Sequence, residues 1–187
     1  VFLFALTACE GPEEVAPPPP AMRKAIIGIQ GQSVNGISSV AEYDITNQTL
    51  DNSVFRKQNV QPIGSSMQDL LIDEDAGLIY FVVPGSGEIV VADLHTYEII
   101  RNLKSMQGDG LKRMVKVGDN KFYVSSFDED GVYVLRGTKN NLKGVIETGA
   151  DPEAMLVHEN LVFVANTGGF DLDSTVTIIN TLADTVM

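Results

Sequence analysis

The segment "LVFVANTGGFDLDSTVTIINTLADTV" (161–186) decides the fold, because its pattern recurs along the chain. An alternating apolar strand leads through a turn with two glycines to a second alternating strand, a polar turn and the beginning of a third strand. "LIYFVVPGSGEIVVADLHTYEII" (78–100) and "KFYVSSFDEDGVYVLRGTKNNLKGVI" (121–146) follow the same plan. Another short strand precedes each segment, at "MQDLLID", "KRMVKVG" and "PEAMLVH". Four strands recurring every 40 to 45 residues predict an all-β fold, a β-propeller of four-stranded blades.

The first unit begins at a later point of the same plan. Val40 follows Ala25 by 15 positions, as Val176 follows Leu161, so Ala25 begins a second strand and the innermost strand of that blade is missing. In closed propellers the other end of the chain commonly supplies that strand. We therefore expect residues 25–187 to hold about four blades of a seven-bladed ring, with units of about 25–58, 59–106, 107–148 and 149–187. A complete four-bladed ring is the competing interpretation.

The first residues, "VFLFALTAC" (1–9), are too few to span a bilayer but match the end of a signal peptide. Leu6 to Cys9 resemble the bacterial lipobox, in which the thiol is diacylated and the chain is cut before the cysteine. We expect residues 1–8 to end a lipoprotein signal peptide, and residues 9–24 to be the lipidated Cys9 with a tether rich in Pro and Glu. The alternative is an apolar start with a free thiol.

The net charge of the chain disfavours some classes of binding partner. Thirteen Lys and Arg against 25 Asp and Glu give a formal charge of -12, which disfavours nucleic acid and anionic lipid surfaces. A negative surface also simply keeps a secreted protein soluble. Because Cys9 is the single cysteine, no disulfide forms within the chain. The acidic residues that follow it resemble an export tag for the outer surface of the bacterial outer membrane, so we expect a protein anchored there by lipid.

The repeats resemble a known family. "GADPEAMLV", "LVFVANTGG", "STVTIINTLADTV" and "VVADLHTYEII" are similar to the YVTN-repeat β-propellers, and "LDNSVFRKQN" with "IGSSMQDLLI" is similar to a lipoprotein branch of Bacteroides-type bacteria. Ser125, Ser126 and Arg136 depart from the repeat pattern in the third unit. Some members of that branch capture cobalamin and pass it to a TonB-dependent outer-membrane transporter. The resemblance therefore implies a corrinoid (cobalamin) ligand and such a transporter as partner.

Candidate ligand residues lie on one face of the predicted ring. The loops that enter the innermost strands and those between second and third strands share a face, because neighbouring strands alternate in direction. We expect Gln68, Arg113 and Glu153 to occupy equivalent positions there, just before "DLLI", "MVKV" and "AMLV". An amide, a cation and a carboxylate suit a ligand with mixed polarity. The alternative is that all three are solvated loop residues.

Two aromatic residues follow strand ends on the same face. Phe127 and Phe170 are expected to be partly exposed and to offer flat apolar surfaces to a planar ligand. The alternative is that each ring is covered by its own loop.

We predict no catalytic, metal or cofactor site. "FDEDGVYVLRG" (127–137) lacks the Glu that a calcium loop of the EF type needs after its Gly, and hairpin turns account for its aspartates. His95 and His158 are the only histidines, and both fall in turns on the opposite face. The sequence thus favours non-catalytic binding. A structural or interaction propeller that docks a transporter or a cell-surface polymer is the alternative.

Overall fold

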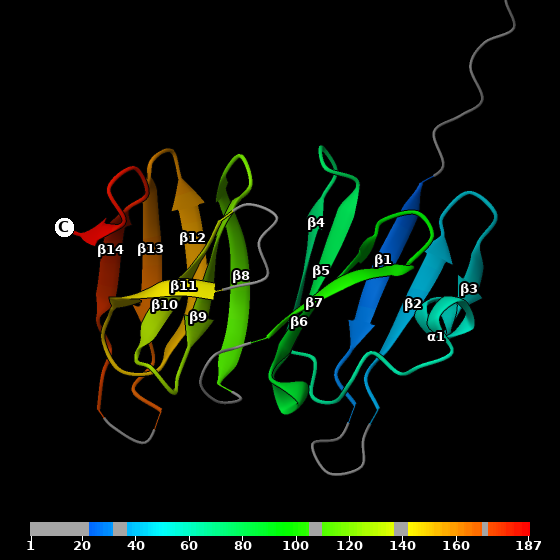
Figure 1. The fold of residues 1–187 in the computed structure, drawn as a ribbon, viewed down its shortest axis with the longest axis horizontal. Coiled ribbons are helices and arrows are strands. Elements are labelled where there is room, and N and C mark those ends of the chain that lie inside the picture. The colour runs from blue at the N-terminus through cyan, green and yellow to red at the C-terminus, as the bar shows by residue number, and fades with distance from the viewer. Residues whose placement is uncertain (1–22, 32–36, 105–109, 137–141, 170–171) are drawn as a thin grey trace, which may run out of the picture.

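The computed structural model describes residues 23–31, 37–104, 110–136, 142–169 and 172–187. Its strands form four antiparallel sheets, which we call blades 1 to 4 in chain order (Figure 1). Blade 1 has three strands and each other blade has four. The strands are β1 (Lys24–Ile29), β2 (Ser39–Asp44), β3 (Thr49–Asp51), β4 (Asp69–Asp73), β5 (Leu78–Val83), β6 (Glu88–Asp93), β7 (Ile99–Lys104), β8 (Leu111–Gly118), β9 (Lys121–Ser126), β10 (Gly131–Arg136), β11 (Leu142–Glu147), β12 (Pro152–His158), β13 (Leu161–Asn166), β14 (Val176–Asn180) and β15 (Thr185–Val186). The predicted propeller of four-stranded blades is confirmed.

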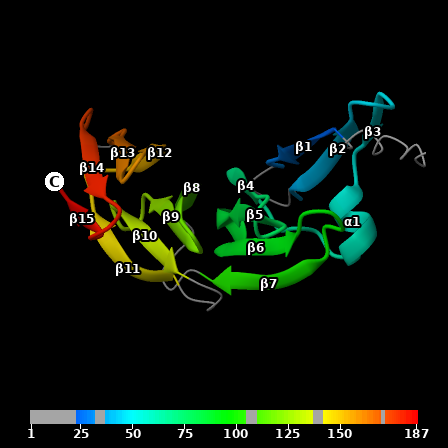
Figure 2. The same cartoon turned by 90° about the horizontal axis from the view of Figure 1, so that it is seen from above.

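The blades stand side by side on an arc (Figure 2). The strands β4, β8 and β12 lie along its inner side, and β7 and β11 along its outer side. Blades 1 and 4 lie at the two ends of the arc, so the described residues do not close a ring. The connection from β1 to β2 lies beside the chain that enters β4, since Ser38 N–H donates to Gly64 O at 2.9 Å. It therefore corresponds to a connection between second and third strands, as the spacing of the first unit predicts.

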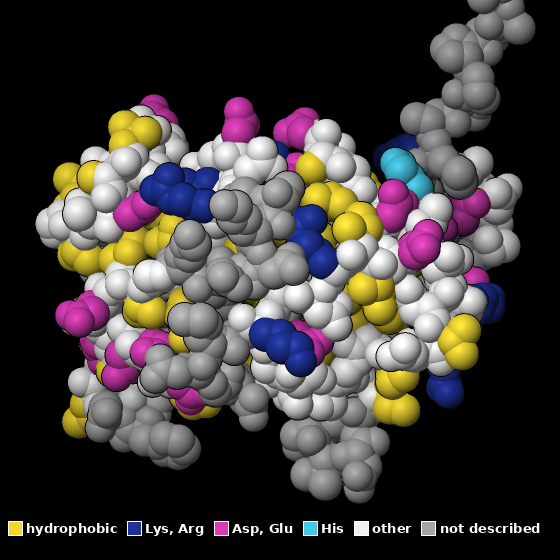
Figure 3. Space-filling view, viewed as in Figure 1, with side chains coloured by type: hydrophobic (Ala, Val, Ile, Leu, Met, Phe, Trp, Pro, Cys, Tyr) yellow, Lys and Arg dark blue, Asp and Glu magenta, His cyan; other side chains and the backbone are white. Residues whose placement is uncertain are grey.

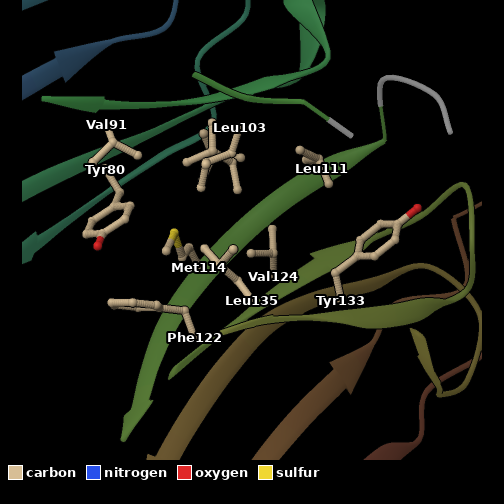
Figure 4. Close-up of a cluster of buried hydrophobic side chains, with 11 residues drawn as sticks. Tyr80, Val91, Leu103, Leu111, Met114, Phe122, Val124, Tyr133 and Leu135 are labelled. Carbon is tan, nitrogen blue, oxygen red and sulfur yellow. The ribbon is translucent and has the colours of Figure 1, made fainter. Parts of the chain in front are cut away.

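Blades 2 and 3 are buried on both faces of their sheets, because each packs between two neighbouring blades. In β5 the residues from Ile79 to Val83 are all buried. In β13, by contrast, burial alternates, so that Val162 and Val164 are buried while Phe163 is only half-buried. Between blades 2 and 3, eleven buried side chains form one apolar cluster (Figure 4). Each such side chain contributes about 1.5–3 kcal/mol to stability through burial.

Within the described residues, short helices occur at two places. The helix α1 (Val54–Asn59) follows β3, and the 3-10 turn η1 (Pro84–Ser86) joins β5 to β6. The residue pattern does not predict α1, because a six-residue helix with one buried residue has no apolar stripe. That residue is Phe55, whose ring contacts Phe81 edge-on at 5.7 Å. No helix in the described part of the chain is long and apolar enough to cross a membrane.

The outer side of the arc mixes acidic, basic and apolar side chains (Figure 3). Apolar side chains gather at its blade 4 end, where Val176, Leu182 and Val186 are exposed. Between blades 3 and 4, Asp184 accepts a hydrogen bond from the Tyr123 hydroxyl and pairs with Lys121 and Arg136. These contacts link the two blades at the face opposite the candidate site.

Candidate functional site

One face of the arc carries the predicted ligand loops, at the lower edge of Figure 1. Backbone hydrogen bonds hold the entries to the inner strands against the loops between second and third strands. Phe127 N–H donates to Gly110 O at 3.0 Å, and Thr167 N–H donates to Asp151 O at 3.1 Å. The two sets of loops therefore share a face, as predicted, and we call it the loop face.

Two β-bulges shape the inner strands at the loop face. Leu111 pairs with Ser126 and Met114 with Val124, so two residues, Lys112 and Arg113, lie opposite one. Glu153 and Ala154 form the matching bulge of β12, between the pairs Pro152–Asn166 and Met155–Val164. A bulge redirects side chains and is common beside functional sites. Here Lys112 and Arg113 line two different hollows.

The bulges correct one prediction. Gln68, Arg113 and Glu153 are not at equivalent positions: Lys112 is the first residue of its bulge, as Glu153 is of the other, and Arg113 is the second. The predicted correspondence set "MVKV" against "AMLV", whereas Met114 pairs with Val124 as Met155 pairs with Val164, so it was one residue out of register. The structure nevertheless brings the three predicted residues together. Arg113 donates to the main-chain oxygen of Gln68, and its Nη2 lies 3.3 Å from Glu153 Oε1.

A hollow of about 320 Å³ opens beside Arg113, and we call it the arginine hollow. It lies where blades 1, 2 and 3 meet. Its lining residues are Gly28, Gln30, Met67, Gln68, Asp69, Leu70 and Arg113.

Asp69 is the acidic residue of this hollow, and it was not among the predicted site residues. Its Oδ2 accepts the Met114 N–H at 2.9 Å and its Oδ1 accepts the Leu70 N–H at 3.0 Å, so it joins blade 2 to blade 3. Burial raises the pKa of this carboxyl against the lowering effect of both N–H groups and of Arg113. The only sequence signal was an acidic residue at the start of an apolar strand.

Glu153 contacts one lining residue of the arginine hollow, Arg113, and one of a second hollow, Lys112. Its Oε2 lies 2.7 Å from Lys112 Nζ, which also lies 2.6 Å from Asp151 Oδ1. Burial opposes the charge of Lys112, but the hydrogen bonds that it donates to Asp151 and Glu153 outweigh this effect and raise the pKa of the ammonium group. Lys112 and Arg113 therefore hold Glu153 from two sides.

Ser125 forms hydrogen bonds with the backbone of both Arg113 and Glu153. Its side chain is fully buried, and its hydroxyl accepts the Arg113 N–H at 3.1 Å and donates to Glu153 O at 2.9 Å. The serine that departs from the repeat pattern thus fixes the backbone of two candidate residues across a blade junction. Its neighbour Ser126 is also buried, but its hydroxyl has no hydrogen-bond partner among the described residues.

The second hollow, of about 440 Å³, lies between blades 3 and 4, and we call it the phenylalanine hollow. Phe127 is 48% exposed at its edge, with Lys112 Nζ 5.4 Å from the ring centroid. The other lining residues are Asp130, Ala150, Asp151, Gly168 and Gly169. A side chain at Gly169 would be strained, since its φ is +52° and an added Cβ would lie 2.8 Å from Asp151 Oδ2. Phe170 lies outside the described residues.

The opposite face carries both histidines, at the turn after β6 and at the end of β12. It also has a hollow of about 480 Å³ between blades 1 and 2, whose lining includes His95 and the part-exposed Ile45 and Ile72. The described chain enters β1 from this face, through Arg23. Cys9 lies outside the described residues.

Acidic side chains of the loop face stabilise turns by accepting hydrogen bonds. Asp173 accepts hydrogen bonds from Thr175 and from the Ala150 N–H, and these contacts lower its pKa. Asp130 accepts the Asp151 N–H at 2.8 Å. Within the described residues, no three His, Cys, Asp or Glu side chains are placed to hold a metal ion.

Comparison with known proteins assigns the family. Residues 33–187 match the domain of unknown function DUF5074. The chain belongs to the DUF5074 family. A search of curated proteins gives no match for this DUF5074 chain.

Solved structures resemble the chain in fold. A hydrazine synthase of Kuenenia stuttgartiensis has a TM-score of 0.62 and 14% identity, over 80% of this chain and 42% of that one. A functionally unknown protein of Desulfotomaculum acetoxidans has a TM-score of 0.61 and 15% identity, over 84% of this chain and 49% of that one. The WD40 β-propeller domain of Doa1 has a TM-score of 0.57 and 11% identity, over 81% of this chain and 48% of that one. The DUF5074 chain thus spans less than half the length of these structures, and identities this low indicate a shared propeller fold alone.

Proposed function

We propose that this DUF5074 protein is an outer-membrane lipoprotein that captures a corrinoid on its loop face, without catalysis, for a TonB-dependent transporter. The observation that carries the binding role is the convergence of Gln68, Arg113 and Glu153 beside two adjoining hollows. Binding pockets typically combine apolar surface with a few fixed polar groups. The resemblance to the YVTN-repeat lipoproteins supports the ligand class and the transporter.

The chemistry of the loop face suits such a ligand. A corrinoid is a large flat ring with polar arms, and the half-exposed ring of Phe127 offers an apolar surface beside polar groups. Arg113 and Asp69 offer a donor and an acceptor in one hollow. Ion pairs and backbone hydrogen bonds hold these side chains before any ligand arrives, which lowers the entropic cost of binding.

Calorimetry of the full-length protein with cyanocobalamin tests the proposal. Removing the guanidinium in Arg113→Ala should cost about 1.5–3 kcal/mol, the usual value of a charged hydrogen bond, and so weaken binding about 10- to 100-fold. Gln68→Ala should weaken it less, because its amide is neutral. His158→Ala on the opposite face is the matched control and should bind like the wild type. Absence of any binding heat would reject corrinoid capture.

A structural or interaction propeller is the second candidate function. The hollow of the opposite face, with its part-exposed Ile45 and Ile72, favours this role because the chain also enters from that face. A partner in the membrane would dock there while the loop face stays open. Co-purification of a transporter that Ile45→Asp with Ile72→Asp abolishes, and Arg113→Ala leaves unchanged, would support this candidate.

A further inference from the structure

The arginine hollow places a donor and an acceptor on the same small space. Each carboxylate oxygen of Asp69 accepts one backbone N–H, and a carboxylate oxygen has a lone pair left for a second donor. The Arg113 guanidinium has five N–H groups, more than its contacts with Gln68 and Glu153 require. Asp69 and Arg113 therefore both have bonding capacity for a ligand group in the hollow that they line.

The charges around this hollow are unbalanced. Among the described residues Arg113 is the single cation that lines it, and Glu153 already pairs with Arg113. Lys112 lies on the other side of Glu153, where Asp151 and Glu153 hold it. In the described residues no cation lies within hydrogen-bond distance of the Asp69 carboxyl, so an anionic group that enters the hollow meets no countercharge there and is repelled by Asp69 and Glu153.

We infer that the arginine hollow selects a neutral carboxamide group over a carboxylate; the inference rests on the proposed ligand-binding function and specifies its chemistry. An amide C=O accepts from Arg113 while the amide NH₂ donates to Asp69. A carboxylate has two acceptor oxygens and no hydrogen to donate, so it accepts a hydrogen bond from Arg113 but cannot donate one to Asp69, and its charge repels the Asp69 carboxylate. Gln68 at the same hollow adds a second amide that pairs with an amide in the same way.

The size of the hollow limits what enters it. A space of about 320 Å³ admits one short arm of a ligand and excludes a corrin ring with its substituents. A corrinoid carries several peripheral carboxamide arms, so one arm occupies the hollow while the ring remains outside. The hollow then discriminates between ligands by the end group of that arm.

Calorimetry on the full-length protein compares cyanocobalamin with derivatives in which one peripheral carboxamide is hydrolysed to a carboxylate. One of these acids should bind wild-type protein at least about tenfold more weakly, because it places two carboxylates together. In Asp69→Asn, which keeps the side-chain shape and an acceptor oxygen, this difference should disappear. Asp75→Asn, an exposed carboxylate at the opposite face, is the matched control and should keep it. Equal binding of all derivatives to wild type, or unchanged discrimination in Asp69→Asn, would overturn the inference.

A second probe separates this inference from the identity of the ligand. Propionamide and propionate are titrated at millimolar concentration while the NMR signals of the Arg113 Nε–H and the Leu70 N–H are followed. Propionamide should shift both signals and propionate should not. If no corrinoid binds but propionamide still gives these shifts, corrinoid capture is rejected and the amide selectivity stands. If propionate shifts the signals as strongly as propionamide, the selectivity is rejected whatever the corrinoid result.

Discussion

Ser125→Ala tests whether the blade junction below the site is held as the structure indicates. The hydroxyl of Ser125 is the partner of two backbone groups, the Arg113 N–H and Glu153 O, at 3.1 and 2.9 Å. Because the serine side chain is fully buried, water does not replace the hydroxyl in the variant. Leaving one buried polar group without a partner costs about 1–3 kcal/mol. Both groups together give an expected loss of about 2–6 kcal/mol in the free energy of unfolding.

Ser126→Ala provides the matched control. It removes the same atom from the next residue, which is equally buried but has a hydroxyl without a hydrogen-bond partner in the described structure. Removing an unsatisfied buried hydroxyl should leave stability unchanged or raise it slightly. Urea unfolding of the two full-length variants, followed by circular dichroism, measures the difference. Equal stability of Ser125→Ala and Ser126→Ala would refute the reasoning.

Three further predictions concern other parts of the chain. Phe55→Ala removes the anchor of α1 against Phe81 and should cost about 3–5 kcal/mol in urea unfolding, whereas a loss below about 1 kcal/mol would mean that the helix does not depend on it. Burial opposes the charge of Asp184, but hydrogen bonds from Lys121, Tyr123 and Arg136 outweigh it and lower the pKa of this carboxyl below 3.8 in the folded protein. The stability that Asp184 contributes is therefore present above about pH 3.8, and it is lost as the pH falls through the lowered pKa of the folded state. Asp184→Asn should flatten the fall in melting temperature below about pH 4, and a pH profile parallel to the wild type would contradict this. Mass spectrometry of a bacterial membrane fraction should detect a diacylated peptide beginning at Cys9, while an uncleaved N-terminus would reject the lipoprotein assignment.

The strands were predictable because their signal is local. Alternation and β-branched runs identify β5, β9 and β13, and the recurrence of the pattern identifies the blades. The helix α1 was not predictable, since distant contacts hold it rather than its own periodicity: Phe55 packs against Phe81, and the Asn59 side chain bonds to the backbone of Tyr97 and Ile99.

The candidate site was predictable in place but not in detail. The loop face and the proximity of Arg113 to Glu153 follow from the repeat, because equivalent loops of neighbouring blades are adjacent. The bulges at Lys112 and Glu153 depend on strand pairing and have no signal in the residue pattern. The same holds for Ser125, which the sequence shows only as a departure from the repeat and which the fold connects to the next blade.

A crystal structure of the full-length protein with cyanocobalamin tests the central claim most directly. We predict that the corrinoid lies on the loop face, with one carboxamide arm between Asp69 and Arg113 and its ring outside the arginine hollow. A corrinoid bound on the face of His95 and His158, or crystals grown in excess ligand with none bound, would contradict the account.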